Sequence, residues 1–292
     1  MPSVSSNRSN PKRGQPARLT GWLAGLSLVA SVLLAGCQSP PASPPQTPLA
    51  GVFRFALTFD DGPSTRPDYN PTLDILDLLA RNDVQPGIKA AFFVQTRNAN
   101  GGGSEAGQAI MRRMQADGHV LGLHSGDPRG HVGHLRLTPD ALRQTLDDGK
   151  ADIESITGRP TELVRPPYFA YSPETFAIYR AAGLRMMLTD VSANDGVIHV
   201  FNISFRRRSH MQAELRRIRE FAQRGELPAI GGVTPIVVTF HDPNPFTAEH
   251  FTEYLHILTD AARDAGLPLD ATPFYDDTAA LRAALLFKAR SE

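Results

Sequence analysis

Two adjacent carboxylates, Asp60 and Asp61, follow a run of apolar residues at 52–59. The glycine and proline at positions 62–63 predict that a buried strand stops there. Side chains alternate in direction along a strand, so the two carboxylates face different ways and can serve different functions. One could bind a metal ion while the other moves protons. The alternative is a simple turn, because Asp-Gly is also a common turn sequence.

Further polar groups follow other predicted strands. They are His124-Ser125, Arg165-Pro166-Pro167-Tyr168, the acidic segment from Asp190 to Asp195, and Phe240-His241-Asp242. In a barrel of parallel strands, the chemistry lies where the carboxyl ends of the strands meet. We therefore expect these groups to gather with Asp60 and Asp61 at one edge of a sheet.

Predicted strands and helices alternate along the chain, which indicates parallel strands and an α/β fold. Strands are expected at 52–59, 90–94, 119–123, 163–165, 185–189, 235–240 and 268–275. Helices are expected at 72–81, 109–116, 138–157, 172–183, 201–222, 247–265 and 278–288. About seven strand-helix units fit a (β/α)7-8 barrel, and an open doubly wound sheet would fit them too.

The amino terminus carries the pattern of an export signal. Residues 1–36 combine a basic start, an apolar stretch and small residues before Cys37. This arrangement is similar to a bacterial lipoprotein signal, which implies a lipidated Cys37 and anchoring at the periplasmic face of a membrane. Gln38 favours the outer membrane over the inner one. A plain membrane anchor is the alternative. Residues 37–50 are proline-rich and predict an extended tether, which leaves 51–292 as the folded domain.

The composition is that of an ordinary soluble enzyme, with 41% hydrophobic and 21% charged residues. The formal net charge is zero, so bulk electrostatics do not argue for a nucleic-acid partner. Cys37 is the only cysteine, which excludes an intrachain disulfide and a cysteine nucleophile in the folded domain. The oligomeric state is left open by the sequence.

In chain order, the segments around these polar groups resemble the signature of the polysaccharide deacetylases of the NodB-homology type, carbohydrate esterase family 4. The resemblance spans roughly residues 53–242. It implies an irregular (β/α) barrel and an acetylated polysaccharide as substrate. It also implies one divalent metal, for which zinc is the first expectation and cobalt, nickel or manganese stay open.

The resemblance implies a role for each matching residue. Asp61 and His124 would bind the metal, and Asp60 would act as general base on the attacking water. Arg165 would pair with Asp60 and keep it ionised. The backbone N–H of Tyr168 would donate to the developing oxyanion.

The same resemblance makes His241 the general acid that protonates the leaving amine. Asp195 would orient and charge this histidine, and Asp190 is the alternative carboxylate. A histidine with a carboxylate partner titrates in the range that this work needs. The fourth motif departs from the family at two positions, where Ser192 and Gly196 replace an aspartate and a tryptophan. The missing tryptophan leaves one wall of the expected acetyl pocket unassigned.

The second metal histidine also departs from the family pattern. Pro128 stands at the usual position, and the candidates His131 and His134 follow an insertion at 126–130. The spacing from His131 to Leu137-Thr138 matches the family and favours His131, with His134 as the alternative.

Three functions are compatible with these residues. The first is a metal-dependent hydrolase that removes acetyl groups from N-acetylated sugars of an envelope or extracellular polysaccharide. The second is an O-acetyl esterase of the xylan type. The third is a lipid-anchored glycan-binding protein that has lost turnover, which the altered second and fourth motifs would explain.

Overall fold

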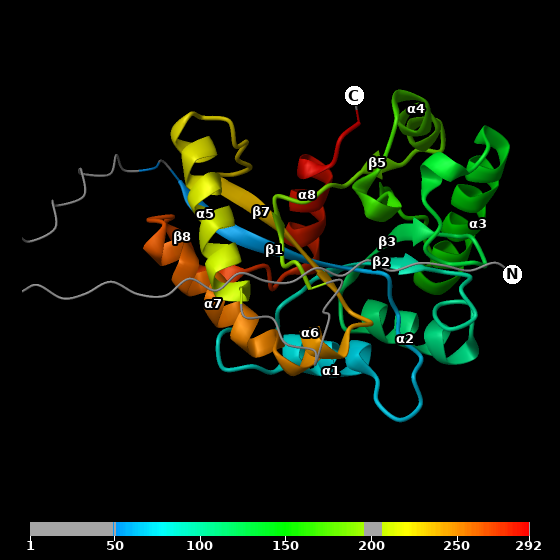
Figure 1. Cartoon of the computed structure of the whole chain (residues 1–292), viewed down its shortest axis with the longest axis horizontal. Helices are drawn as coiled ribbons and strands as arrows, with labels where there is room; N and C mark the ends of the chain where they lie inside the picture. Colours follow the sequence, from blue (N-terminus) through cyan, green and yellow to red (C-terminus); the bar gives the residue numbers. More distant parts are fainter. Residues whose placement is uncertain (1–48, 50, 196–205, 292) are drawn as a thin grey trace, which may run out of the picture. The chain divides into compact units, whose positions relative to one another are not determined.

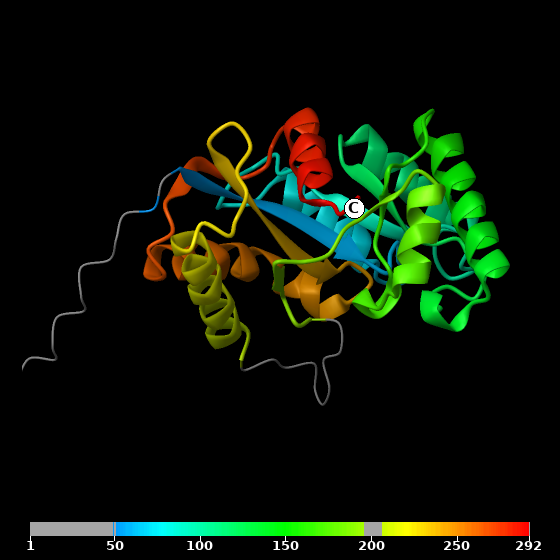
Figure 2. The ribbon, with the colours of Figure 1, turned by 90° about the horizontal axis from the view of Figure 1, so that it is seen from above.

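The computed structural model describes residue 49, residues 51–195 and residues 206–291 of the 292-residue chain. Within these residues the strands are β1 (Val52–Asp60), β2 (Ala91–Gln95), β3 (Val120–Ser125), β4 (Leu163–Val164), β5 (Arg185–Met186), β6 (Val191–Ser192), β7 (Val233–His241) and β8 (Leu269–Phe274). The α-helices are α1 (Pro71–Ala80), α2 (Glu105–Ala116), α3 (Pro139–Thr157), α4 (Pro173–Ala181), α5 (Arg207–Gln223), α6 (Pro245–Glu249), α7 (Phe251–Asp264) and α8 (Thr278–Lys288). Helices flank the sheet in both views (Figures 1 and 2).

All strand pairs of the sheet are parallel, in the order β5-β4-β3-β2-β1-β7-β6. Strand β8 also pairs with β1, beside Phe53 and Phe55, whereas β2 pairs with the other half of β1 from Thr58 to Asp60. The order ends at β5 and β6, so the described strands form an open half-barrel. This is the predicted α/β fold of the (β/α)7 type.

The alternation of side chains along β1 divides the sheet into two faces. Phe55, Leu57 and Phe59 belong to the main apolar core. Ala56, between them, belongs to a second apolar cluster that includes residues of α8. Because strands have a two-residue period, Thr58 and Asp60 share the face of Ala56. The strand therefore delivers one carboxylate to that face at its carboxyl end.

Several helix starts follow the sequence expectations. The side chains of Asn70, Thr138 and Ser172 each accept a hydrogen bond from a backbone N–H in the first turn of α1, α3 and α4. Proline occupies an early position in each of these helices, where its missing N–H has no cost.

Other expectations need correction. The strand expected at 185–189 ends at Met186, and the short strand β6 was not expected. The helix expected at 247–265 is two helices, α6 and α7, which meet at His250 with a non-helical backbone. The start of the helix expected at 201–222 lies outside the described residues, which show α5 from Arg207.

The proposed export signal, Cys37 and most of the tether also lie outside the described residues, so they stay predictions. No helix in the part of the chain that the structure describes is long and apolar enough to cross a lipid bilayer.

Candidate active site

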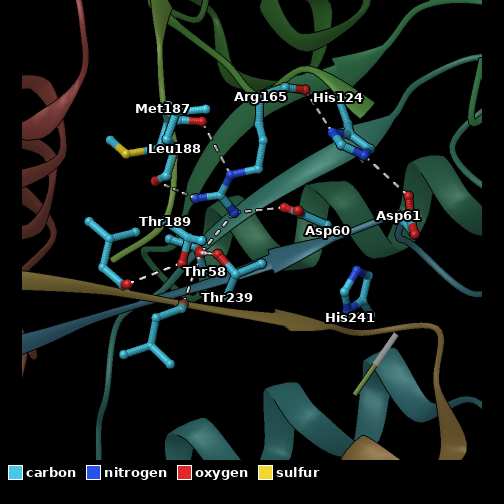
Figure 3. Close-up of polar contacts among 12 residues, drawn as sticks. Thr58, Asp60, Asp61, His124, Arg165, Met187, Leu188, Thr189, Thr239 and His241 are labelled. Atoms are coloured by element: carbon cyan, nitrogen blue, oxygen red, sulfur yellow. Dashed lines mark hydrogen bonds and ion pairs between the residues drawn. The ribbon is translucent and has the colours of Figure 1, made fainter. Parts of the chain in front are cut away.

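The polar groups singled out in the sequence come together at the carboxyl ends of the central strands. Figure 3 shows Asp60, Asp61, His124 and His241 around the end of β1, with the Arg165 side chain beside them. Asp60 and His241 are direct partners in the register of β1 and β7. The arrangement contains three carboxylate pairings, one each for Asp60, Asp61 and Asp195, which are described in turn.

Asp60 is paired with a fully buried arginine. The Arg165 guanidinium donates to Asp60 Oδ1 at 2.7 Å and to the Thr58 hydroxyl at 2.8 Å (Figure 3). The guanidinium carbon also lies 4.1 Å from the centre of the Phe93 ring. Burial lowers the pKa of Arg165, and the negative charge of Asp60 opposes that effect. Arginine stays protonated in proteins, so the guanidinium can only donate, and this pair fixes the orientation of the Asp60 carboxylate.

Asp61 faces two imidazoles. Its Oδ1 lies 3.2 Å from His124 Nε2 and 3.6 Å from His131 Nε2, and the ligand atoms of the three residues lie within 4.8 Å of one another. Although burial would raise the pKa of Asp61, the hydrogen bond and charge of His124 and the charges of nearby histidines hold it well below its ordinary value.

Each of the two histidines turns its Nε2 atom toward Asp61. His124 Nδ1 lies 2.8 Å from the Arg165 carbonyl, which accepts the Nδ1 proton, and Nε2 is the ring nitrogen that faces Asp61. Among the described residues, buried His131 Nε2 has no hydrogen-bond partner, although it lies 3.6 Å from Asp61 Oδ1. One carboxylate and two imidazoles are a donor set for a divalent cation, and an unpartnered ring nitrogen aimed into the set fits such an ion.

The alternative ligand His134 is placed differently. It begins a short 3-10 helix, is fully buried, and has Nδ1 2.7 Å from the Tyr179 hydroxyl. Burial, together with the positive charges of His124 and His131, lowers the pKa of His134 to about 3. His134 does not belong to the cluster formed by Asp61, His124 and His131. The geometry therefore favours His131 as the third ligand.

His241 is held by Asp195. Its Nδ1 lies 2.8 Å from Asp195 Oδ1, and its backbone N–H donates to Asp195 Oδ2 at 2.9 Å. The Thr247 hydroxyl donates to the same oxygen at 2.6 Å, so the carboxylate is fully buried but well satisfied. Asp190, the alternative partner, instead pairs with Lys288 at 2.9 Å and accepts from the Val237 backbone.

Tyr168 lies beside the metal-type cluster. Its ring stacks on that of His131 with centroids 4.4 Å apart, and 64% of the residue is exposed. The residue adopts a left-handed backbone with φ 61°, which is uncommon for a bulky side chain. The rigid turn therefore brings both the ring and the backbone of Tyr168 to the edge where the other groups meet.

Gln95 of the site was not predicted, and Asp242 belonged to a predicted segment but was given no role. Gln95, the last residue of β2, donates from Nε2 to Asp61 Oδ1 at 3.0 Å. Asp242 is fully buried and accepts from the Thr72 hydroxyl at 2.6 Å, and its Oδ1 has no hydrogen-bond partner within the part of the chain that the structure describes. Burial and then the nearby charge of Asp61 raise the pKa of Asp242 to about 7, although Thr72 opposes the shift. A polar residue that ends an apolar strand was the available signal for both.

Comparison with known proteins agrees with these motifs. Residues 52–187 match the polysaccharide deacetylase family. The chain is 29% identical over 141 residues to a chitin deacetylase of Pestalotiopsis sp, which covers 48% of this chain and 43% of that protein. It is 33% identical over 113 residues to a peptidoglycan-N-acetylglucosamine deacetylase of Bacillus cereus, which covers 39% of this chain and 35% of that protein. The matches thus span less than half the length of these curated relatives.

Solved structures share the fold. The chitin deacetylase of Colletotrichum lindemuthianum superposes with a TM-score of 0.55 at 22% identity, over 77% of this chain and 88% of that one. A family 4 acetyl xylan esterase from Clostridium thermocellum, in complex with a cobalt ion, gives 0.50 at 24% identity, over 78% and 96%. The fold and the motifs agree with the match of residues 52–187 to the polysaccharide deacetylase family.

Proposed function

We propose that this protein hydrolyses the N-acetyl groups of an envelope or extracellular polysaccharide with the help of one divalent metal, for which zinc is the first candidate. The observation that carries the proposal is the convergence of the Asp61–His124–His131 cluster, the Asp60–Arg165 pair and the Asp195–His241 pair at one sheet edge. These groups supply the ligands, base and acid that amide hydrolysis needs.

The residues divide the reaction between them. Asp61, His124 and His131 would hold the metal, which supplies Lewis acidity toward the acetyl carbonyl and the attacking water. Asp60, held in place by Arg165, takes a proton from the water as the water oxygen bonds to the carbonyl carbon.

The leaving amine must receive a proton. His241 donates a proton to the nitrogen as the carbon–nitrogen bond breaks, which releases acetate and the free amine. Burial opposes the charged imidazole, but the Asp195 carboxylate raises the pKa of His241 to about 9, so the imidazolium is present at neutral pH. The Tyr168 backbone N–H donates to the carbonyl oxygen as negative charge develops there.

An O-acetyl esterase is the second candidate. The same base, oxyanion donor and metal ligands would cleave an ester, and a fold neighbour is a family 4 acetyl xylan esterase. An alkoxide leaving group places less demand on a general acid than an amine does. The strong pairing of His241 with Asp195 therefore favours the amide substrate.

We also propose that the chain is exported and lipidated at Cys37, which would anchor it to the periplasmic face of a bacterial membrane, the outer one first. The lipoprotein-type sequence before Cys37 supports this proposal. Metabolic labelling with a fatty-acid analogue tests it: label should enter the wild-type chain but not the Cys37→Ala variant. Equal labelling of both chains would refute the proposal.

The enzymatic proposal is tested with the full-length chain in detergent. Acetate release would be measured from N-acetylglucosamine oligomers, peptidoglycan and acetylated xylan, with and without chelator and added Zn²⁺ or Co²⁺. Release should stop with chelator and in Asp61→Ala and His131→Ala. The matched controls are His256→Ala and Asp140→Ala, which remove exposed side chains on other helices. Release that survives chelator or both site variants would overturn the mechanism.

A further inference from the structure

We infer that Gln95 is a positioning residue for the Asp61 metal ligand, and that the inserted loop before His131 is seated on the same amide network. The inference rests on the proposed metal site. Gln95 is only 6% exposed, and its Nε2 donates at 3.0 Å to Asp61 Oδ1, the oxygen that faces both imidazoles. Its backbone N–H also donates to the Gly62 carbonyl at 2.9 Å, directly after Asp61.

The network has a fixed direction. The Asn100 backbone N–H donates to Asn98 Oδ1 at 2.8 Å, and Asn98 Nδ2 donates to Gln95 Oε1 at 3.3 Å. A backbone N–H can only donate and an ionised carboxylate can only accept, so both amides are oriented from their two ends. The Gln95 N–H is thereby kept on Asp61, which leaves that carboxylate less free to rotate.

The inserted loop packs on this network through Gly130, the residue before His131. Gly130 has a left-handed backbone with φ 82°. A Cβ atom there would lie 2.0 Å from Asn98 Nδ2 and 2.5 Å from Gln95 Oε1, so only glycine allows the loop to approach the two amides. The Gly130 carbonyl accepts from the Val132 backbone at 2.8 Å, which turns the chain around His131.

This contact accounts for the unusual spacing of the two histidines. Six residues separate His124 from His131, and His131 Nε2 still comes within 3.6 Å of Asp61 Oδ1. One buried side chain, that of Gln95, thus contacts Asp61 on one side and supports the loop that carries His131 on the other. Groups that orient metal ligands from behind typically change metal affinity by about 10–100-fold when they are removed.

The test measures metal binding directly, without substrate. Gln95→Met keeps the side-chain length but removes both amide contacts. We expect the Kd for Zn²⁺, from chelator competition, to rise by about 10–100-fold, with a changed visible spectrum of the Co²⁺-loaded protein. Gln144→Met, which alters an exposed glutamine on α3, should leave both unchanged. An unaltered Kd and Co²⁺ spectrum in Gln95→Met would overturn the inference, even if the metal-free protein melted earlier.

A second pair of variants tests the loop separately. Gly130→Ala should also weaken Zn²⁺ binding and alter the Co²⁺ spectrum. Gly158→Ala is its matched control, because Gly158 has the same left-handed backbone, φ 74°, but no neighbour within 4 Å of an added Cβ. Equal Zn²⁺ affinities in these two variants would overturn the role given to Gly130. Because no glycan is present, these outcomes do not depend on which acetyl group the protein removes.

Discussion

Replacing Asp195 by asparagine would remove the charge that keeps His241 protonated. Burial alone would lower the pKa of His241, but the hydrogen bond and charge of Asp195, with smaller contributions from Asp60 and Asp61, raise it to about 9. Relative to the ordinary value of 6.5, this favours the imidazolium by about 3 kcal/mol, at 1.36 kcal/mol per pKa unit. In Asp195→Asn the opposing effect of burial remains, so we expect titration at or below the ordinary value.

The assay is an NMR titration of the His241 ring in the metal-free protein. Asp190→Asn is the control, because Asp190 lies on the same segment but pairs with Lys288. His241 in this control should titrate like the wild type. The reasoning would be refuted by an unchanged His241 titration in Asp195→Asn, or by an equal shift in Asp190→Asn.

The same pair links stability to pH. The pKa of His241 is raised in the folded protein, so the pair stabilises the fold fully below the unfolded value of 6.5. That stabilisation is lost as the pH rises through about 9. The difference in unfolding free energy between wild type and Asp195→Asn should therefore be largest below pH 6.5 and shrink toward pH 9. A pH-independent difference would contradict this assignment.

Three further predictions concern buried contacts of the site. Arg165→Met should lower the unfolding free energy by about 3–5 kcal/mol, because Asp60 is left as an uncompensated buried charge. A second change, Asp60→Asn, should recover part of the loss. His134→Ala should lower it by about 1–3 kcal/mol, since the Tyr179 hydroxyl loses its buried contact with His134 Nδ1, while Zn²⁺ affinity stays unchanged. Gly62→Ala should also lower it by about 1–3 kcal/mol through overpacking, because its Cβ would lie 2.0 Å from an Asp242 carboxylate oxygen.

Urea unfolding measures all three effects. If the Arg165→Met variant were as stable as the wild type, the loss of Arg165 would not leave a costly buried charge on Asp60, and the prediction would be wrong. Loss of Zn²⁺ binding in His134→Ala would return His134 to the list of ligands. For Gly62→Ala, a double-mutant cycle with Asp242→Ala should show positive coupling, and purely additive effects would contradict the clash.

The sequence was sufficient to predict the fold and the meeting of the site residues. Apolar runs that end in polar residues locate the strand ends, and parallel strands bring their carboxyl ends to one edge. The alternation along β1 then sends Asp60 to one face and leaves Asp61 at the turn beyond the strand. These rules depend on local pattern and topology, which a single sequence contains.

Other features depend on distant contacts that a single sequence does not state. β6 has only two residues, and it is a strand only because it pairs with β7. α6 and α7 are separated at His250, where the sequence has no proline or glycine to signal the break. Gln95 continues an apolar strand, and its importance depends on an inserted loop whose course the sequence leaves open. The choice of His131 rather than His134 as the third metal ligand rests in the sequence on spacing alone, and only the position of the two rings distinguishes them clearly.

The backbone conformation argues against the hypothesis that this protein only binds glycans and has no catalytic activity. Every described non-glycine residue with positive φ lies in a segment of the site, and these residues are Asp61, Tyr168, Phe169 and Asn194. Such conformations are unfavourable for most residues and persist where the surrounding structure holds them. The fully buried charge of Arg165 adds further cost at the same edge. The placement of these unfavourable features around one carboxylate-imidazole cluster is what a hydrolytic site requires, and it favours turnover over binding alone.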